Sequence, residues 1–268
     1  MSAVRAYTAI FAARLKMLLQ YRAAAWAGVG TQLFFGAALV AMRQAFYHSS
    51  ATPPPLPEAQ MITYSWLVQA FFALSPFTSN PDPEVRSMMR DGTVAYELAR
   101  PLDLYTLWFT RNAANRVAPT ILRCLPIFVI GMALLGMQPP PSLAAFLTFL
   151  LALAGAVALI AAWCTLITIS LLWTISGDGI ARITPGLISV LSGQILPIAL
   201  MPDGLKPLLA FLPFTGMVDA PFSLWIGSRA PGEVGLILLH QLAWTLVFVF
   251  TGRFLLARGL KRLTVQGG

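Results

Sequence analysis

The chain has 268 residues, of which 57% are hydrophobic and only 10% are charged, and its formal net charge is +8. Its mean hydropathy is +0.74. Because soluble domains carry about a quarter charged residues, this composition excludes an ordinary water-soluble domain. It predicts an all-α integral membrane protein, in which helices satisfy their own backbone hydrogen bonds.

The first 22 residues predict an amphipathic helix on the inner membrane surface. Apolar side chains recur on one face at spacings of three and four, namely at Val4, Tyr7, Phe11, Leu15 and Leu18. Arg5, Lys16 and Gln20 fall on the opposite face, and Arg14 lies on the flank. The alternative is an extended first span whose charged end reaches the membrane surface.

Six apolar stretches approach or exceed the roughly 20 residues that a helix needs to cross a bilayer. They are residues 23–42, 61–78, 117–137, 143–175, 183–201 and 234–255. The fourth is too long for one crossing and too short for two crossings with a turn. It therefore predicts a tilted helix that projects beyond the membrane.

Residues 202–232 are apolar but interrupted by prolines, at positions 207, 213, 221 and 231. A proline inside a helix costs about 3 kcal/mol and removes a backbone donor. Short helices that re-enter the outer membrane face, shielded by protein, are therefore expected between the fifth and sixth spans. The alternative is a pair of ordinary spans kinked at these prolines.

The distribution of lysine and arginine predicts the orientation. With the N-terminus in the cytoplasm, only Arg43, Lys206 and Arg229 of the 18 lysines and arginines lie outside. Both termini are then cytoplasmic. The basic excess reflects topology, and nucleic acid is not expected as a partner.

The motifs of several catalytic classes are missing from the sequence. No GxxxxGK[ST] loop is present to bind nucleotide phosphates, so the chain is not expected to hydrolyse ATP or to be an enzyme. Cys124 and Cys164 lie in separate apolar runs, which predicts buried free thiols and no metal site.

An ion-driven carrier usually needs an ionisable group near the membrane midplane, but no carboxylate lies at the centre of a predicted span. His240 and Gln241 do lie within the sixth span. Hydrogen bonds to neighbouring helices and a proton relay are the two interpretations for these side chains. If the chain moves a substrate, we expect the energy to come from a partner.

The loop at residues 79–116 joins the second and third spans and contains "RDGTVAYELARPLD". Gly92 allows a turn after the preceding helix, and Thr93 to Ala99 can form two helical turns with Val94 and Leu98 on one face. The residue before Pro101 disfavours helical geometry, which ends the helix. The pattern predicts a short cytoplasmic helix suited to docking, whereas the alternative is a solvated basic loop.

On these residues the chain resembles the permease subunits of ABC-2 exporters, whose pattern is a basic residue, any residue, glycine, a hydrophobic strip and Leu-x-Arg-Pro-Leu. The resemblance implies a single permease domain over residues 1–268 in the bacterial cytoplasmic membrane. It also implies an ABC ATPase partner that holds ATP and magnesium, and a second permease, identical or related, that completes a dimeric core.

In such permeases the loop between spans two and three forms a coupling helix that binds the ATPase. The resemblance implies that role for Arg90, Asp91, Gly92, Glu97, Leu98, Arg100 and Pro101. Two other interpretations stay open: a non-transporting scaffold or assembly subunit, and a proton-coupled carrier that uses His240. No pattern in the sequence indicates the substrate.

Overall fold

The structure is a computed structural model that describes residues 3–49, 54–75, 82–173 and 178–261, without the side chains of residues 3, 90 and 178–182. Within these residues the protein is all-helical and has no strand. The helices, in chain order, are α1 Ala3–Leu18, α2 Arg22–Ser49, α3 Glu58–Ala70, α4 Pro83–Arg90, α5 Ala95–Leu98, α6 Leu104–Leu134, α7 Leu143–Ser170, α8 Asp178–Leu191, α9 Lys206–Phe211, α10 Asp219–Trp225 and α11 Val234–Leu260. Three single 3₁₀ turns complete them: η2 Ile198–Leu200, η3 Thr215–Met217 and η4 Pro231–Glu233.

Four of the described helices are long and apolar enough to cross a membrane: α2, α6, α7 and the helix that runs from Pro231 through α11. At about 1.5 Å per residue, the 28 residues of α2 or α7 extend about 42 Å, more than the roughly 30 Å hydrocarbon core. The predicted membrane protein with several spans is thereby confirmed.

The other two predicted spans are shorter helices, so the count of six is not confirmed. Helix α3 has 13 residues and is followed by a turn that begins at Phe71. Helix α8 has 14 residues and is followed by Gly193, whose φ of +85° is left-handed, and then by Pro197. Each covers only about 20 Å.

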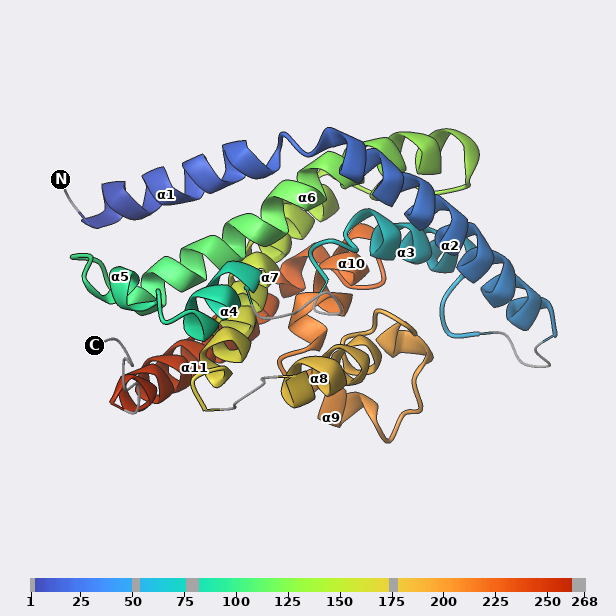
Figure 1. Cartoon of the computed structure of the whole chain (residues 1–268). Coiled ribbons are helices and arrows are strands. Elements are labelled where there is room, and N and C mark those ends of the chain that lie inside the picture. Colours follow the sequence, from blue (N-terminus) through green and yellow to red (C-terminus); the bar gives the residue numbers. More distant parts are fainter. Residues whose placement is uncertain (1–2, 50–53, 76–81, 174–177, 262–268) are drawn as a thin grey trace.

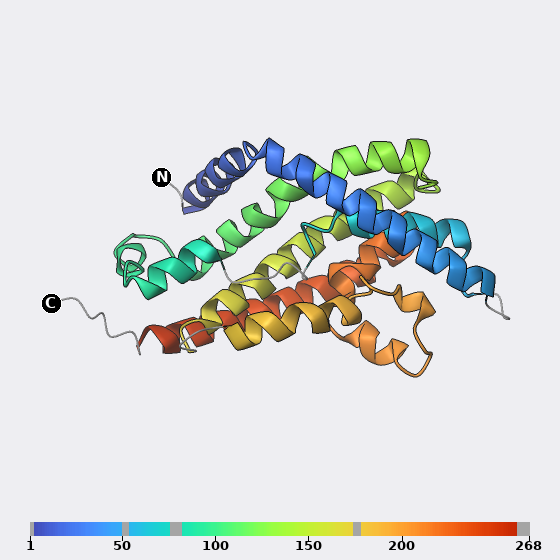
Figure 2. The same ribbon diagram turned by 45° about the vertical axis from the view of Figure 1, so that its right-hand side comes forward.

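The long helices run along one axis, and the connections gather at two ends. Figures 1 and 2 place the start of α1, helix α5 and the end of α11 at one end, which we call the α5 end. The end of α2 and the connection from α6 to α7 lie at the opposite end. Helix α1 runs alongside α6, and a break at residues 19–21 separates it from α2.

Helix α1 packs through most of the apolar face that its sequence predicts, but Val4 at its start is 70% exposed. Tyr7, Phe11 and Leu15 are partly buried, while Arg5 and Lys16 are exposed. Its placement on a membrane surface stays a prediction.

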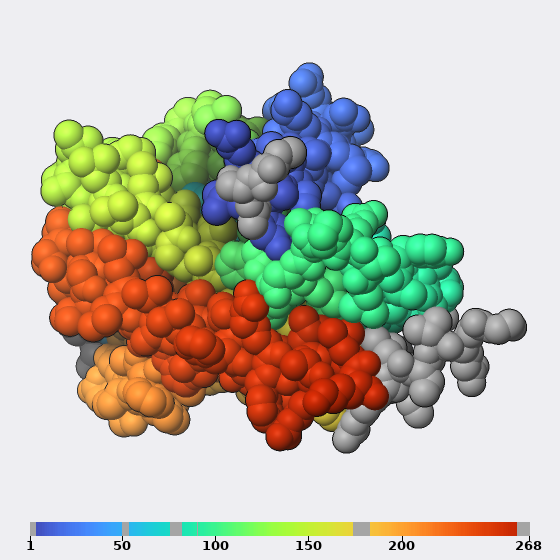
Figure 3. All heavy atoms as spheres, turned by 90° about the vertical axis from the view of Figure 1, so that its left-hand side faces the viewer, coloured from blue at the N-terminus to red at the C-terminus, as the bar shows by residue number. Residues whose placement is uncertain are grey.

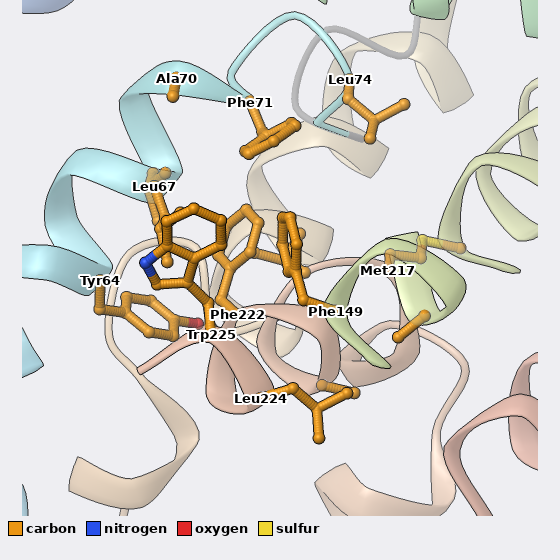
Figure 4. Close-up of a cluster of buried hydrophobic side chains, with 14 of the residues drawn as sticks. Tyr64, Leu67, Ala70, Phe71, Leu74, Phe149, Met217, Phe222, Leu224 and Trp225 are labelled. Atoms are coloured by element: carbon orange, nitrogen blue, oxygen red, sulfur yellow. The ribbon is translucent and has the colours of Figure 1, made fainter. Parts of the chain in front are cut away.

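An aromatic cluster forms the main core where α3, α7 and α10 meet (Figure 4). Trp225 packs its ring edge-to-face on Phe149, with centroids 4.9 Å apart, and Phe71 stands 5.7 Å from Phe222. Edge-to-face pairs add about 0.5–1.5 kcal/mol beyond area burial. This cluster joins the short α3 and α10 firmly to the long α7.

Residues 202–232 form no straight span, as the prolines predict. The six-residue α9 and the seven-residue α10 are separated by the η3 turn. Asp219 at the start of α10 is buried and accepts hydrogen bonds from the Tyr64 hydroxyl at 3.1 Å and the Ile198 amide at 3.0 Å. Ser223 donates to the other oxygen at 3.3 Å. These bonds fasten the segment to α3; its re-entry into the membrane stays a prediction.

Candidate functional site

Helix α4 ends where the sequence predicts, at the turn of Gly92. Asp82 caps its N-terminus by accepting a 2.9 Å hydrogen bond from the Glu84 amide, and Pro83 occupies the first helical position. Asp91 is the C-cap, and Gly92 has a φ of +71°, a conformation that favours glycine. The predicted glycine turn is therefore confirmed.

Helix α5 is one turn, Ala95–Leu98, shorter than the two turns predicted from Thr93 to Ala99. Val94 is 2% exposed and packs into a second core cluster with Trp108 and other residues of the α5 end. Leu98 is 42% exposed, so the two residues do not share one apolar surface. Tyr96, which sequence reasoning missed, is 75% exposed.

Glu97 points inward, although the sequence predicts it at a partner surface. It is 3% exposed, accepts a 2.8 Å hydrogen bond from the Trp108 indole, and forms a 2.5 Å ion pair with Arg111. Both partners belong to α6. Removing one member of a buried pair leaves an uncompensated charge, so this contact holds α5 against α6.

The remaining predicted residues of the loop are exposed and close together in the chain. Asp91, Gly92, Arg100 and Pro101 all lie on the surface, and Asp91 accepts a 3.0 Å hydrogen bond from Ser87. The Arg90 side chain lies outside the described residues. Figure 3 shows α4 and α5, in green, on the surface between α1, in blue, and the end of α11, in red.

A polar network ties α4 to three long helices. Arg14 of α1 donates to Asn115 of α6 at 3.0 Å and to Glu84 of α4 at 2.6 Å. Asn115 in turn donates to Asp82 at 3.2 Å, and the Asp82 amide donates to Thr168 of α7 at 3.3 Å. The loop is therefore bonded to α1, α6 and α7.

Asp103 makes the corresponding connection to α11. It caps α6 by accepting a 3.0 Å hydrogen bond from the Thr106 amide, and Arg253 of α11 pairs with its carboxylate at 2.9 Å. The Tyr7 hydroxyl of α1 accepts from the Asp103 amide at 2.8 Å. Burial raises the pKa of Asp103, but the hydrogen bonds from Thr106 and the Arg253 charge outweigh it, so that pKa lies below its usual value.

A model of a transporter family matches residues 56–267, a range that includes the whole polar network around α4 and α5 except α1. Its description is the ABC-2 family transporter protein. The chain belongs to the ABC-2 transporter family. Proteins of this family are transmembrane subunits, generally not catalytic themselves, that normally work with an ATPase subunit. No curated protein and no solved structure matched the chain.

Two polar side chains inside α11 of this ABC-2 protein bridge neighbouring elements. Gln241 is buried and donates to the Ala152 carbonyl at 2.9 Å and the Gly216 carbonyl at 2.8 Å. His240 Nε2 lies 3.2 Å from the Phe211 carbonyl, to which it donates. These bonds favour the helix-bridging interpretation over a proton relay.

The cysteines of the ABC-2 protein are free thiols, as predicted. Cys164 is fully buried, but Cys124 is only partly buried, because α6 turns this face toward an apolar groove between α6 and α7. The prediction of burial is therefore correct for Cys164 alone.

Proposed function

We propose that this chain is the permease subunit of an ATP-driven exporter in the bacterial cytoplasmic membrane. It forms half of a translocation pathway together with an identical or related permease, and a separate ATPase binds ATP and magnesium. The observation that carries the proposal is the exposed turn of α5 in a chain of the ABC-2 family. Glu97 fastens this turn to α6, and the flanking residues of the loop are bonded to α1, α6, α7 and α11. Substrate identity is no part of the proposal.

The docking surface consists of Tyr96, Leu98, Arg100 and Pro101, with Asp91 and Gly92 at its edge. Exposed aromatic and arginine side chains are the types that anchor protein interfaces. Glu97 acts indirectly, because its carboxylate is bound to Trp108 and Arg111 and positions the surface.

The hydrogen bonds around the loop provide a route from the ATPase to the membrane. A ligand shifts an equilibrium only through its different affinity for the two states. ATP favours closed ATPase subunits, and that preference reaches the permease only through this contact. A displaced α4–α5 unit pulls on α1, α6 and α7 through Arg14, Asn115 and Asp82, and on α11 through Asp103 and Arg253.

The directions of the long helices support six crossings. Helix α2 runs away from the α5 end, yet α6 begins there, so the chain returns between them through α3 and the residues that follow. Helix α7 ends at the α5 end, whereas α11 starts at the far side, so α8 and its continuation make a second return. We place the α5 end and both termini in the cytoplasm and residues 202–232 as a re-entrant segment at the outer face.

The deciding experiment replaces the exposed apolar side chains of α5. Tyr96→Ala/Leu98→Ala should reduce co-purification of the ATPase that accompanies the wild-type chain by at least about tenfold, since anchor residues contribute 2 kcal/mol or more each. Tyr21→Ala, which removes a tyrosine that is 63% exposed elsewhere, should leave co-purification unchanged.

Two results would overturn the proposal. The first is a wild-type complex that contains no nucleotide-binding subunit. The second is a double variant that retains its ATPase and couples hydrolysis to transport as the wild type does.

A further inference from the structure

A pocket of about 200 Å³ lies at the end of α11 that faces away from the α5 end. It is formed between α9, α10 and the first two turns of α11. Its lining includes Thr215, Arg229, Glu233, Leu236, Ile237 and His240. This volume is large enough for several water molecules or a small polar headgroup.

The pocket carries one positive and one negative side chain that are not paired with each other. Arg229 and Glu233 both line it, and the ion pairs among the described residues do not include them. Glu233 Oε1 accepts a 2.9 Å hydrogen bond from the Ala230 amide, which fixes the carboxylate and leaves Oε2 available. A ligand with both charge signs therefore matches the pocket better than a simple anion or a simple cation does.

Asp219 lies near enough to Arg229 to interact with it electrostatically, but the hydrogen bonds and ion pairs of the described residues do not join the two side chains. The Asp219 oxygens already accept from Tyr64, Ile198 and Ser223. The Arg229 N–H groups remain available to a phosphate, which a guanidinium binds well through two parallel hydrogen bonds.

Exposed apolar side chains lie on α9 and α11, the helices on two sides of the pocket. They are Leu208 and Phe211 of α9 and Leu236 and Leu239 of α11, each between 57% and 71% exposed. In a helix that crosses the membrane, this succession from charged pocket to apolar surface corresponds to the boundary between headgroups and acyl chains. The ligand is thus an amphiphile whose polar part enters the pocket and whose chains cover α9 and α11.

We propose that this pocket binds the headgroup of a phosphatidylethanolamine, with its phosphate on Arg229 and its ammonium on the Glu233 carboxylate. The Thr215 side chain, the His240 imidazole and Ile237 form the polar and apolar walls. The inference does not depend on an ATPase partner, because every group it uses belongs to α9, α10, α11 and their connections.

The test titrates the purified full-length chain in detergent with short-chain phosphatidylethanolamine and follows binding by native mass spectrometry and calorimetry. The wild type should bind it at least about tenfold more tightly than phosphatidylglycerol, which leaves Glu233 without a cation. Arg229→Gln and Glu233→Gln should each lose about tenfold in affinity, and Arg229→Lys, which keeps the positive charge but not the two parallel hydrogen bonds, should lose less than Arg229→Gln.

Lys206→Gln is the matched control, because it removes a positive charge from the same connecting segment, where Lys206 pairs with Asp203 outside the pocket. It should bind as the wild type does. Free phosphoethanolamine, which lacks the chains that cover Leu236 and Phe211, should bind more weakly than the lipid.

The proposal is overturned if Glu233→Gln binds the lipid normally, or if Lys206→Gln weakens binding as much as the pocket variants do. Equal affinity of the wild type for the ethanolamine and glycerol lipids would also overturn it. Equal binding of free phosphoethanolamine would overturn the assignment to a lipid. If Arg229→Gln fails to fold, Glu233→Gln still tests the proposal. The Glu233 carboxylate accepts a hydrogen bond from the exposed Ala230 amide, so its replacement should leave the fold intact.

Discussion

At the scale of single residues, Glu97 shows how a loop of mixed charge is organised. Its carboxylate faces Arg111 and Trp108 of α6, so its charge is buried in a contact inside the protein. Its neighbours Tyr96 and Leu98 consequently point outward. One inward side chain thus decides which face of a single helical turn meets solvent or a partner.

We expect Glu97→Ala to destabilise the α5 turn by about 3 kcal/mol or more, because Arg111 and the Trp108 indole would be left buried without their partner. Hydrogen exchange of the amides at residues 92–100 should accelerate strongly in this variant. Glu97→Gln, which keeps an acceptor for Trp108, should have a smaller effect. Asp91→Ala removes an exposed carboxylate of the same loop and is the control; equal exchange in Glu97→Ala and Asp91→Ala would contradict the positioning role.

At the scale of helices, the α5 end is held together by charged side chains that join elements distant in sequence. Arg14 connects α1 to α4 and α6, and Asp103 connects the start of α6 to Arg253 near the end of α11. Exposed ion pairs contribute little one at a time. Here they share partners and hydrogen bonds, and they supplement the second core cluster around Trp108.

The pH dependence of the Asp103 contact follows from its lowered pKa. A carboxyl whose folded pKa lies below its unfolded value, 3.8 here, stabilises the fold above that value and loses this contribution as the pH falls through the folded pKa. The melting temperature of the wild type in detergent should therefore fall as the pH decreases below about 4. Asp103→Asn should reduce this fall.

The control for that measurement is Asp203→Asn. Asp203 also has a lowered pKa, because of a hydrogen bond from Lys206, but the pair is exposed and lies within one connection. Its removal should leave the acid dependence of the melting temperature almost unchanged. If the melting temperature of Asp103→Asn falls with decreasing pH as much as that of the wild type, the contact between α6 and α11 is not the cause of the acid dependence.

At the scale of the whole molecule, two short helices complete a bundle of four long ones. Helices α3 and α10 contribute Tyr64, Phe71, Phe222 and Trp225 to the core, and the buried Asp219 links them through hydrogen bonds. Helices α2 and α6 run away from the α5 end and α7 and α11 run back toward it, so the start of α1, helix α5 and the end of α11 lie at one end of the molecule.

Labelling of single cysteines tests this arrangement in cells. In a background with Cys124→Ala and Cys164→Ala, Leu205→Cys should react with a membrane-impermeant maleimide in intact cells, since Leu205 is 48% exposed and lies in the segment that we propose at the outer face. Tyr96→Cys should react only after the cells are permeabilised. Labelling of Tyr96→Cys in intact cells would place α5 outside, where no ATPase could reach it.

Much of the fold follows from local properties of the sequence. Helices α2, α6, α7 and α11 are uninterrupted apolar stretches, and Gly92 and the prolines between residues 202 and 232 mark backbone constraints that act within a few residues. The stretch "RDGTVAYELARPLD" resembles the pattern of the ABC-2 family, and the family model that matches residues 56–267 confirms the family.

Other features depend on contacts that no local pattern contains. Glu97 turns inward because Trp108 and Arg111 lie beside it on α6, and the pocket of Arg229 and Glu233 exists because α9 and α10 fold against α11. Hydropathy measures how strongly a segment avoids water. This free energy is a sum over the residues of that one segment, so it can be read from the local sequence. The direction of a single charged side chain is decided by partners far along the chain, and only the tertiary structure brings them together.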